Sequence, residues 1–229
     1  MNSVGALAIA LVVCSLAGYL WGSIPTGYLI GRWLGGLDIR EHGSGSTGTT
    51  NVLRTLGKGP ALGVLLVDLA KGSAAVATAR AVANGFEADS PALVAAFAIV
   101  AALAAIVGHS KPVWLGWRGG KSAATSLGIL LAIAWPVGLA TLVTWLSVLA
   151  LSRIVSLSSI VAAIAAPVFM WVFGQSWPFV AFAIAGGAYV VLRHRSNIQR
   201  LLAGREPRIG QKLDADPQSV DDAPATSAS

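Results

Sequence analysis

Cysteine and charge are scarce in this sequence, and both shortages exclude classes of protein. The chain of 229 residues has one cysteine, Cys14, inside an apolar run, which excludes a disulfide framework and a cysteine metal cluster. Its three histidines share no metal-ligand spacing, so we expect no bound metal. Only 11% of the residues are charged and 55% are hydrophobic, with a mean hydropathy of +0.71. This balance excludes a soluble globular domain and indicates an integral membrane protein.

Long apolar runs predict the membrane-spanning helices. The first run is not preceded by basic residues and is not followed by a small-residue cleavage site with a polar mature chain. We therefore interpret it as a span and not as a signal peptide. The expected spans cover residues 4–31, 60–83, 91–107, 156–173 and 177–192, with a further apolar stretch over residues 122–151.

The length of the stretch 122–151 fits one long tilted helix or two short helices separated at Trp135-Pro136. The distribution of charge decides between them. With a break, fourteen of the sixteen Lys and Arg residues fall on one side, and the opposite side carries Glu87 and Asp89. The positive-inside rule then predicts an all-α bundle of seven short transmembrane helices, with the N-terminus outside and the C-terminus in the cytoplasm.

The end of the chain differs in composition from the rest. From about Asp214 onward it is rich in Ala, Ser, Pro and acidic residues, and it has too few apolar residues to form a packed core. We therefore predict two parts, a seven-span membrane domain over residues 1–213 and a disordered cytoplasmic tail over residues 214–229.

A polar stretch over residues 42–54 interrupts the apolar chain. It holds three glycines, five hydroxyl side chains, Asn51 and Arg54. Glycine lets backbone N–H groups approach an anion closely, and the planar fork of arginine suits phosphate oxygens. This composition predicts a phosphate cradle, although a flexible surface loop has a similar composition.

Two further polar islands, over residues 109–121 and 193–206, fall on the same predicted side of the membrane. Basic residues beside spans ordinarily set topology or contact anionic lipid, but neither role needs a glycine pair next to a lysine. We therefore predict one anion site at the cytoplasmic face, shared by the three islands. The groups that the two further islands contribute are Gly119, Gly120, Lys121, His194, Asn197 and Arg200.

Asp68 and Lys71 lie three residues apart in the predicted second span, which places them on one helix face. Charged residues inside a span are functional candidates by default. A mutual ion pair that stabilises the bundle explains them equally well. The sequence leaves both interpretations open.

Several ordered motifs resemble those of the bacterial acyl-phosphate-dependent glycerol-3-phosphate acyltransferases, which are small seven-span membrane enzymes. The likeness extends over about residues 20–207. Ser46, Lys111 and Ser122 depart from the commonest pattern of that family, where Asn, an aromatic residue and Gly are more usual. The matching pieces are Gly22–Pro25, Gly43–Gly45 with Thr50–Arg54, Asp68–Gly72, Gly108-His109 with Pro112-Val113, Gly119–Lys121, Ala124-Thr125, Ser156–Ser159, and Arg193-His194 with Asn197, Ile198, Arg200, Leu201 and Gly204.

The resemblance implies one reaction of phospholipid synthesis. An acyl group passes from a long-chain acyl phosphate to the C1 hydroxyl of sn-glycerol 3-phosphate, giving lysophosphatidate and inorganic phosphate. It further implies a place in the bacterial inner membrane among membrane lipids, no cofactor, no nucleic acid, and the enzyme that makes acyl phosphate as a partner. The implied catalytic residues are Ser44, Lys121 and His194; the implied substrate-binding residues are Gly43, Gly45, Thr50, Asn51, Arg54, Gly119, Gly120, Ser158, Ser159 and Asn197.

Other acyltransferase and lipid-synthesis signatures are missing. A His-x4-Asp motif is absent, because the fifth residues after the three histidines are Thr47, Trp114 and Gln199. The Asp-rich signature of the alcohol phosphatidyltransferases is absent too. No carboxylate lies near His194 in the sequence to orient it as the base that a serine nucleophile needs. Because acyl phosphate is already an activated anhydride, we predict direct transfer without an acyl-enzyme, with positioning and cations supplying the acceleration.

Two other functions fit parts of the pattern. A transporter of small phosphate esters would use the same cations, but transporters tend to have internal repeats and a site at the membrane midplane. We find no repeat, and the cations cluster on one face. A binder of anionic lipid leaves the glycine pairs unexplained.

Overall fold

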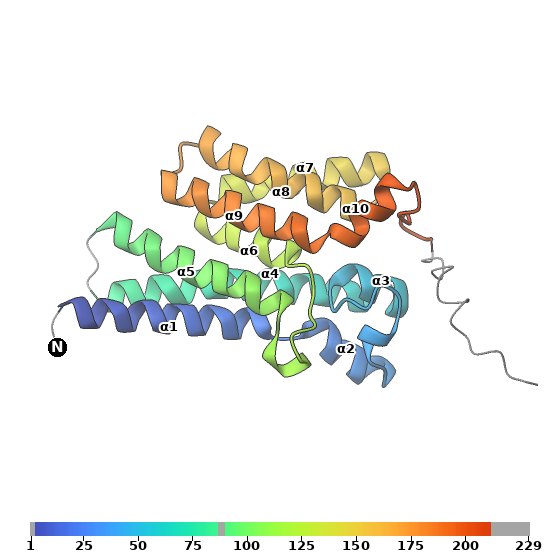
Figure 1. The fold of residues 1–229 in the computed structure, drawn as a ribbon, viewed down its shortest axis with the longest axis horizontal. Helices are drawn as coiled ribbons and strands as arrows, with labels where there is room; N and C mark the ends of the chain where they lie inside the picture. The colour runs from blue at the N-terminus through green and yellow to red at the C-terminus, as the bar shows by residue number, and fades with distance from the viewer. Residues whose placement is uncertain (1–2, 87–89, 212–229) are drawn as a thin grey trace, which may run out of the picture.

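The chain folds into a bundle of helices. A computed structural model describes residues 3–86 and 90–211, and this part of the chain contains no strand (Figure 1). The predicted all-α class is confirmed, whereas Glu87, Asp89 and the predicted tail 214–229 lie outside the described residues. The elements are α1 (Ser3–Ser23), α2 (Thr26–Gly35), the 3-10 helix η1 (Ile39–Glu41), α3 (Thr49–Leu56), α4 (Lys58–Gly85), α5 (Pro91–Ser110), the 3-10 helix η2 (Val113–Leu115), α6 (Ala123–Ile133), α7 (Trp135–Ser152), α8 (Val155–Val172), α9 (Trp177–Arg193) and α10 (Arg195–Leu202).

Most of these helices are apolar enough to lie in a membrane. Two of them, Ala123–Ile133 and Trp177–Arg193, are apolar but shorter than the others. The helix lengths agree with a multi-span membrane protein, while the count of seven spans stays a prediction. Within residues 3–86 and 90–211, the five stretches long enough to cross a membrane are Val4–Gly35, Lys58–Gly85, Pro91–Leu115, Trp135–Ser152 and Val155–Val172.

The apolar stretch 122–151 forms two helices, as predicted. α6 ends at Ile133 and α7 begins at Trp135. Pro136 lies in the first turn of α7, where the missing N–H is harmless because the first N–H groups of a helix have no intrahelical partner. Gly138 then allows α7 to fold back closely on α6, since a Cβ there would lie 2.6 Å from a methyl carbon of Leu131.

The first predicted span, residues 4–31, is not one continuous helix. α1 ends at Ser23 and α2 begins at Thr26. Pro25 has no N–H for a helical hydrogen bond, and its ring disfavours the helical conformation at Ile24. The break is supported from another helix, because Lys71 Nζ donates a hydrogen bond to the Ile24 carbonyl at 2.9 Å.

Small residues bring the long helices close together. α1 crosses α5 at Gly18 and Gly22, where a Cβ would lie 2.3 Å from the Ala101 oxygen and 2.1 Å from the Ala105 oxygen. The crossing of α4 and α6 likewise has a glycine on each helix. Close backbone approach at small residues is a common way of packing helices in membranes, where lipid is as apolar as the helix surface.

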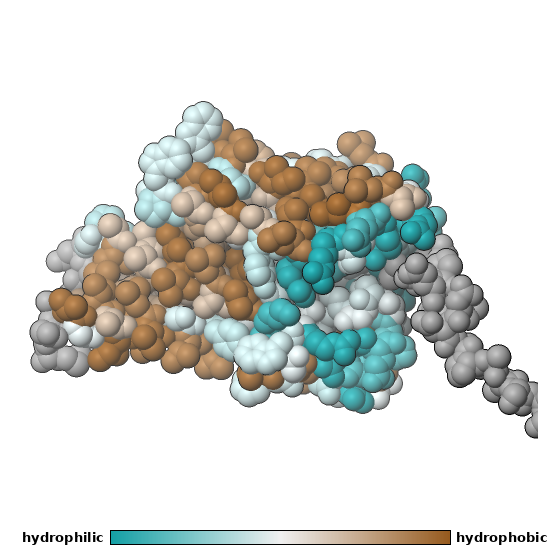
Figure 2. Space-filling view, viewed as in Figure 1, coloured by the Kyte–Doolittle hydropathy of each residue, from teal (hydrophilic) through white to brown (hydrophobic). Residues whose placement is uncertain are grey.

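The polar elements gather at one end of the bundle. In Figure 1, α2, α3 and α10 lie at the right-hand end, while the N-terminus and the start of α5 lie at the left. On the face shown in Figure 2, hydrophobic residues cover most of the length of the bundle, and hydrophilic residues gather over the end that carries α2, α3 and α10. The fold therefore brings the three polar islands of the sequence together, as predicted.

Candidate active site

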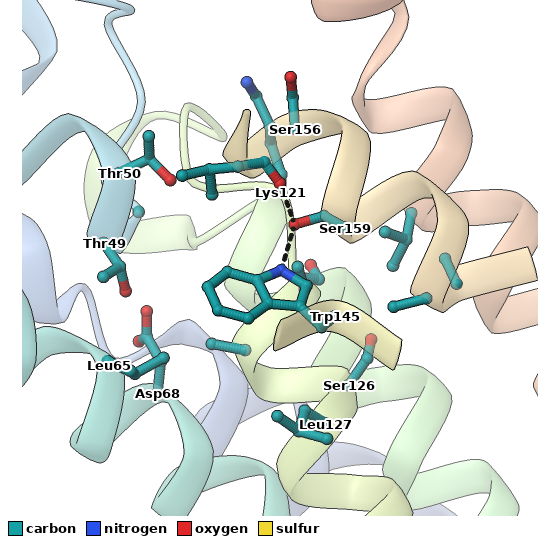
Figure 3. Close-up of a pocket in the computed structure, with 18 of the residues that line it drawn as sticks. Thr49, Thr50, Leu65, Asp68, Lys121, Ser126, Leu127, Trp145, Ser156 and Ser159 are labelled. Carbon is teal, nitrogen blue, oxygen red and sulfur yellow. Dashed lines mark hydrogen bonds between the residues drawn. The ribbon is translucent and has the colours of Figure 1, made fainter. Parts of the chain in front are cut away.

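A cavity of about 580 Å³ extends from the polar end into the bundle. Its volume is in the range of small-molecule binding sites. Thr50 and Lys121 lie toward one end, Leu65 and Leu127 toward the other, and the Trp145 indole lies between them (Figure 3). The cavity thus has a polar end and a mainly apolar end, with Asp68 in the wall beside Leu65.

Asn51 holds the polar loop 42–48 together from the inside. Its side-chain NH2 is shared among the carbonyls of Ile39, His42 and Ser46, each at 2.9 Å. Its Oδ1 accepts a hydrogen bond from the Ser44 N–H at 2.8 Å. Both amide hydrogens of Asn51 are thus engaged by backbone carbonyls. Asn51 also lines the cavity, and its contact with substrate stays a prediction.

Gly43 and Gly45 shape this loop and do not line the cavity. Their φ angles are +56° and +66°, a region that glycine enters without steric cost. A Cβ at Gly43 would lie 2.3 Å from Asn51 Oδ1. The two glycines therefore shape the backbone that presents Ser44, and their contact with substrate stays a prediction.

The second half of the polar stretch is a helix, not a loop. α3 begins at Thr49, and no side chain caps its first turn. Thr50 and Arg54 both line the cavity, because residues four apart lie on one helix face. Within the described part of the chain, the Arg54 guanidinium has no hydrogen-bond or ion-pair partner, and burial lowers its pKa. Arg54 thus offers the cavity a cation that Glu206 attracts only through space, without a hydrogen bond.

Gly119 and Gly120 fit the second island against α5. The Gly119 N–H donates to the Ser110 carbonyl at 3.2 Å and the Gly120 N–H to the His109 carbonyl at 3.1 Å. A Cβ at Gly120 would lie 2.1 Å from His109 Nε2. The two glycines do not line the cavity; they allow the close packing that presents Lys121 to it.

A hydrogen-bonded network joins Lys121 to α8 and α10. Lys121 Nζ donates to Asn197 Oδ1 at 2.5 Å. Asn197 Nδ2 donates to Glu206 Oε1 at 2.7 Å. The same carboxylate accepts from Ser156 Oγ at 2.8 Å and from Arg200 Nε at 2.7 Å. Lys121 is therefore aimed by groups from two other segments, α8 and the island 193–206.

Glu206 is the site residue that the sequence interpretation missed. Burial by itself would raise its pKa, but the hydrogen bonds from Asn197, Ser156 and Arg200 outweigh burial and lower it. The carboxylate is therefore ionised and offsets part of the positive charge around it. One signal was available, since Glu206 is the single acidic residue within the basic segment 193–212.

Lys121 is buried enough for its pKa to change. Burial lowers its pKa to about 8; the nearby Arg200 also lowers it, and Glu206 opposes the change. At neutral pH the ammonium remains charged. A partly desolvated cation binds a phosphate more strongly than one in water, because the effective dielectric constant is lower.

His194 lies at the junction of α9 and α10 and lines the cavity. Its Nδ1 lies 2.8 Å from the Val190 carbonyl oxygen. A carbonyl only accepts hydrogen bonds, so Nδ1 carries the proton and Nε2 carries a lone pair. Burial lowers the pKa of the ring to about 4, which leaves it neutral at pH 7. Val190, and not a carboxylate, sets this tautomer.

The predicted serines differ in position. Ser44 is exposed and lines the cavity, and none of the histidines, all of which are described, hydrogen-bonds to its hydroxyl. Ser158 is buried and donates to the Ile154 carbonyl of its own helix, so its predicted substrate contact is not supported. Ser159 lines the cavity and accepts the Trp145 Nε1–H at 3.1 Å (Figure 3).

The cavity brings together a majority of the predicted site residues. The predicted residues left outside its wall are the four glycines, Ser158 and Arg200, which support it. The predicted residues that line it are Ser44, Thr50, Asn51, Arg54, Lys121, Ser159, His194 and Asn197.

Comparison with protein families gives a match over most of the chain. A family model described as glycerol-3-phosphate acyltransferase matches residues 12–204. A glycerol-3-phosphate acyltransferase of Synechococcus sp. (strain JA-2-3B'a(2-13)) is 60% identical over 209 residues, covering 91% of this chain and 100% of the relative. One of Thermosynechococcus vestitus is 58% identical over 204 residues, covering 89% of this chain and 97% of the relative.

Two solved structures have a similar fold. One is a crystal structure of PlsY (YgiH), an integral membrane glycerol 3-phosphate acyltransferase, in its glycerol 3-phosphate form. It has a TM-score of 0.79 and 39% identity, covering 87% of this chain and 96% of that one. The other is the lysophosphatidic acid form of PlsY, with a TM-score of 0.76 and 37% identity, covering 87% of this chain and 95% of that one.

Proposed function

Because the chain belongs to the glycerol-3-phosphate acyltransferase family, we propose that its acyl donor is an acyl phosphate and that both substrates meet in the cavity. The protein is a multi-pass membrane acyltransferase of phospholipid synthesis that acylates glycerol 3-phosphate. The transporter alternative is not supported, since the relatives are named as acyltransferases.

The observation that carries this proposal is the pair of cations at the polar end of the cavity. Among the described residues, Arg54 reaches it from α3 without a hydrogen-bond or ion-pair partner, and Lys121 reaches it with a neutral amide as its partner. Glycerol 3-phosphate and acyl phosphate each bring a phosphate, whose charge needs such partners in a poorly solvated site. The apolar end, lined by leucines and alanines, offers the acyl chain a surface of matching polarity.

The reaction then needs no covalent intermediate. The C1 oxygen of glycerol 3-phosphate forms a bond to the acyl carbonyl carbon, the carbonyl carbon–phosphate oxygen bond breaks, and the hydroxyl proton passes to the departing phosphate. Lys121 stabilises the charge that develops during this exchange. The His194 lone pair accepts a hydrogen bond from the hydroxyl and orients it, while Ser44 and Thr50 contribute neutral hydrogen bonds.

The donor is tested by the release of inorganic phosphate from purified protein in detergent. We expect release from long-chain acyl phosphate only when glycerol 3-phosphate is present, with lysophosphatidate formed in equal amount. Matched reactions replace acyl phosphate by the acyl-coenzyme A thioester of the same chain length, or omit glycerol 3-phosphate. Transfer from the thioester at the same rate, or phosphate release without the acceptor, would contradict the proposed donor.

We also propose seven spans with the N-terminus outside and the polar end of the bundle in the cytoplasm. Cysteine introduced at Ser90 or at Arg118, both exposed and near opposite ends of α5, tests this orientation in a Cys14→Ala background. We expect an impermeant thiol reagent to label Ser90→Cys in intact cells and Arg118→Cys only after permeabilisation. The reverse pattern would invert the topology, and labelling of both variants from outside would remove α5 as a span.

A further inference from the structure

Asp68 and Lys71 form a buried ion pair that the proposed chemistry does not use, although Asp68 lies in the cavity wall (Figure 3). Lys71 Nζ lies 2.8 Å from Asp68 Oδ1, and the two side chains are 2% and 3% exposed. Removing two charges from water is costly, and replacing such a pair by apolar residues of similar volume often leaves stability unchanged or raised. Stability of the bundle therefore does not account for charges at these positions.

Lys71 connects this pair to the loop that presents Ser44. Its ammonium donates to the Ile24 carbonyl at 2.9 Å, at the break between α1 and α2. From that break α2 runs against the polar loop, where Gly27 packs so closely that a Cβ would lie 2.0 Å from the Thr47 oxygen. Lys71 thus fixes the start of the helix on which the loop 42–48 rests.

Asp68 connects the pair to the segment that presents Lys121. Asp68 Oδ1 lies 3.7 Å from His109 Nδ1, and the same nitrogen lies 3.1 Å from Thr125 Oγ1. The His109 ring in turn lies against Gly120, whose N–H donates to the His109 carbonyl. Asp68 therefore packs against His109 without a hydrogen bond to it, and His109 packs against the turn that immediately precedes the lysine.

We propose that Asp68 and Lys71 are a positioning pair that sets the distance between the two cation-bearing segments of the site, residues 42–54 and 119–121. Lys71 holds one segment by its hydrogen bond to Ile24, and Asp68 packs against the residue beneath the other. Their attraction on one turn of α4 fixes the positions of both side chains, and so of the two segments that these side chains contact. The inference rests on the proposed function only in that the cavity cations hold the phosphate of glycerol 3-phosphate. Displacement of the two segments weakens the binding of this phosphate, because both cations must reach it together.

The test uses a double variant, Asp68→Asn with Lys71→Met, which removes both charges while keeping similar side-chain volumes. We expect a thermal unfolding midpoint close to that of the wild type, because no unpaired buried charge remains. We expect the Kd for glycerol 3-phosphate, measured by calorimetry in detergent without any acyl donor, to rise about tenfold. Unchanged affinity in a folded double variant would overturn the inference.

A second variant decides the matter if the double variant fails to fold. Thr125→Val keeps the shape of a residue that does not line the cavity and removes the hydroxyl beside His109. We expect it to fold and to raise the Kd for glycerol 3-phosphate about threefold, in proportion to one lost hydrogen bond. Wild-type affinity in Thr125→Val, together with an unfolded double variant, would also overturn the inference.

Thr78→Val provides the matched control on the same helix. Thr78 Oγ1 accepts the Trp21 Nε1–H at 3.1 Å and is not part of the cavity wall. We expect this variant to lose stability and to keep the wild-type affinity. A matching rise in Kd in Thr78→Val would show a general effect of loosened packing and contradict a positioning role. Absence of glycerol 3-phosphate binding in the wild type would instead refute the proposed site itself.

Discussion

Lys121→Ala is expected to lower turnover at saturating substrate by at least about a hundredfold, the usual loss when one group that stabilises developing charge is removed. The ammonium lies at the polar end of the cavity and is aimed by Asn197 and, behind it, Glu206. The variant should remain folded, because the lysine lies in a connecting segment outside the helices. Initial rates of phosphate release, with circular dichroism and size exclusion as controls, measure both properties. Near-normal turnover would contradict a role for Lys121 in the reaction.

The pH dependence of kcat/KM separates the charge of Lys121 from its shape. Since burial lowers the pKa of this lysine to about 8, we expect kcat/KM to fall as the pH rises through that value. Between pH 8 and pH 10.5, Lys121 is protonated in the unfolded chain and loses its proton in the folded chain. The contribution of Lys121 to the free energy of unfolding therefore increases as the pH rises. Deprotonation of Lys121 therefore does not unfold the protein, so unfolding would not explain the fall of kcat/KM above pH 8. Lys121→Arg, which stays charged, should keep activity above pH 8, and an unchanged alkaline limb would assign the ionisation to another group.

His194→Ala is expected to lower turnover by about a hundredfold, whereas His194→Gln should retain about a tenth of the wild-type rate. A glutamine amide can donate to the Val190 carbonyl and still present an oxygen that accepts a hydrogen bond. Such retention is expected of a group that orients the hydroxyl, and it is not expected of an obligatory base. Equal loss in the two variants, with glycerol 3-phosphate still bound, would contradict the orienting role.

The acid limb of the pH profile gives an independent test of His194. Burial lowers the pKa of the ring to about 4, so the neutral form persists as the pH falls through the ordinary value of 6.5. The second ionisation of the substrate phosphate, near pH 6, produces a limb in wild type and His194→Gln alike. We therefore expect the ratio of the two kcat/KM values to stay level between pH 7 and about 5. A ratio that changes around pH 6.5 would show that a titrating histidine limits the reaction.

The sequence determined the local features of this protein. Apolar runs of helical length and the distribution of basic residues predicted an all-helical bundle with its cations at one end. The helix break before Trp135 was also predicted, because Pro136 and the charge pattern favour it locally. Arg54, Lys121 and His194 were identified because each lies in a polar segment that contrasts with the apolar chain around it.

Only the tertiary structure decided which of these residues contact the cavity and which support it. Asn51 and the glycines have the composition of a ligand site, yet their partners are backbone atoms of neighbouring loops. Glu206 aims Lys121 although the two residues are far apart in the sequence, and Asp68 acquires its connection to His109 only when α4 and α5 pack together. A polar residue looks the same in the sequence whether its side chain bonds to a ligand or to the protein backbone. Its role is fixed only when the packing of distant segments determines which atoms lie within reach of it.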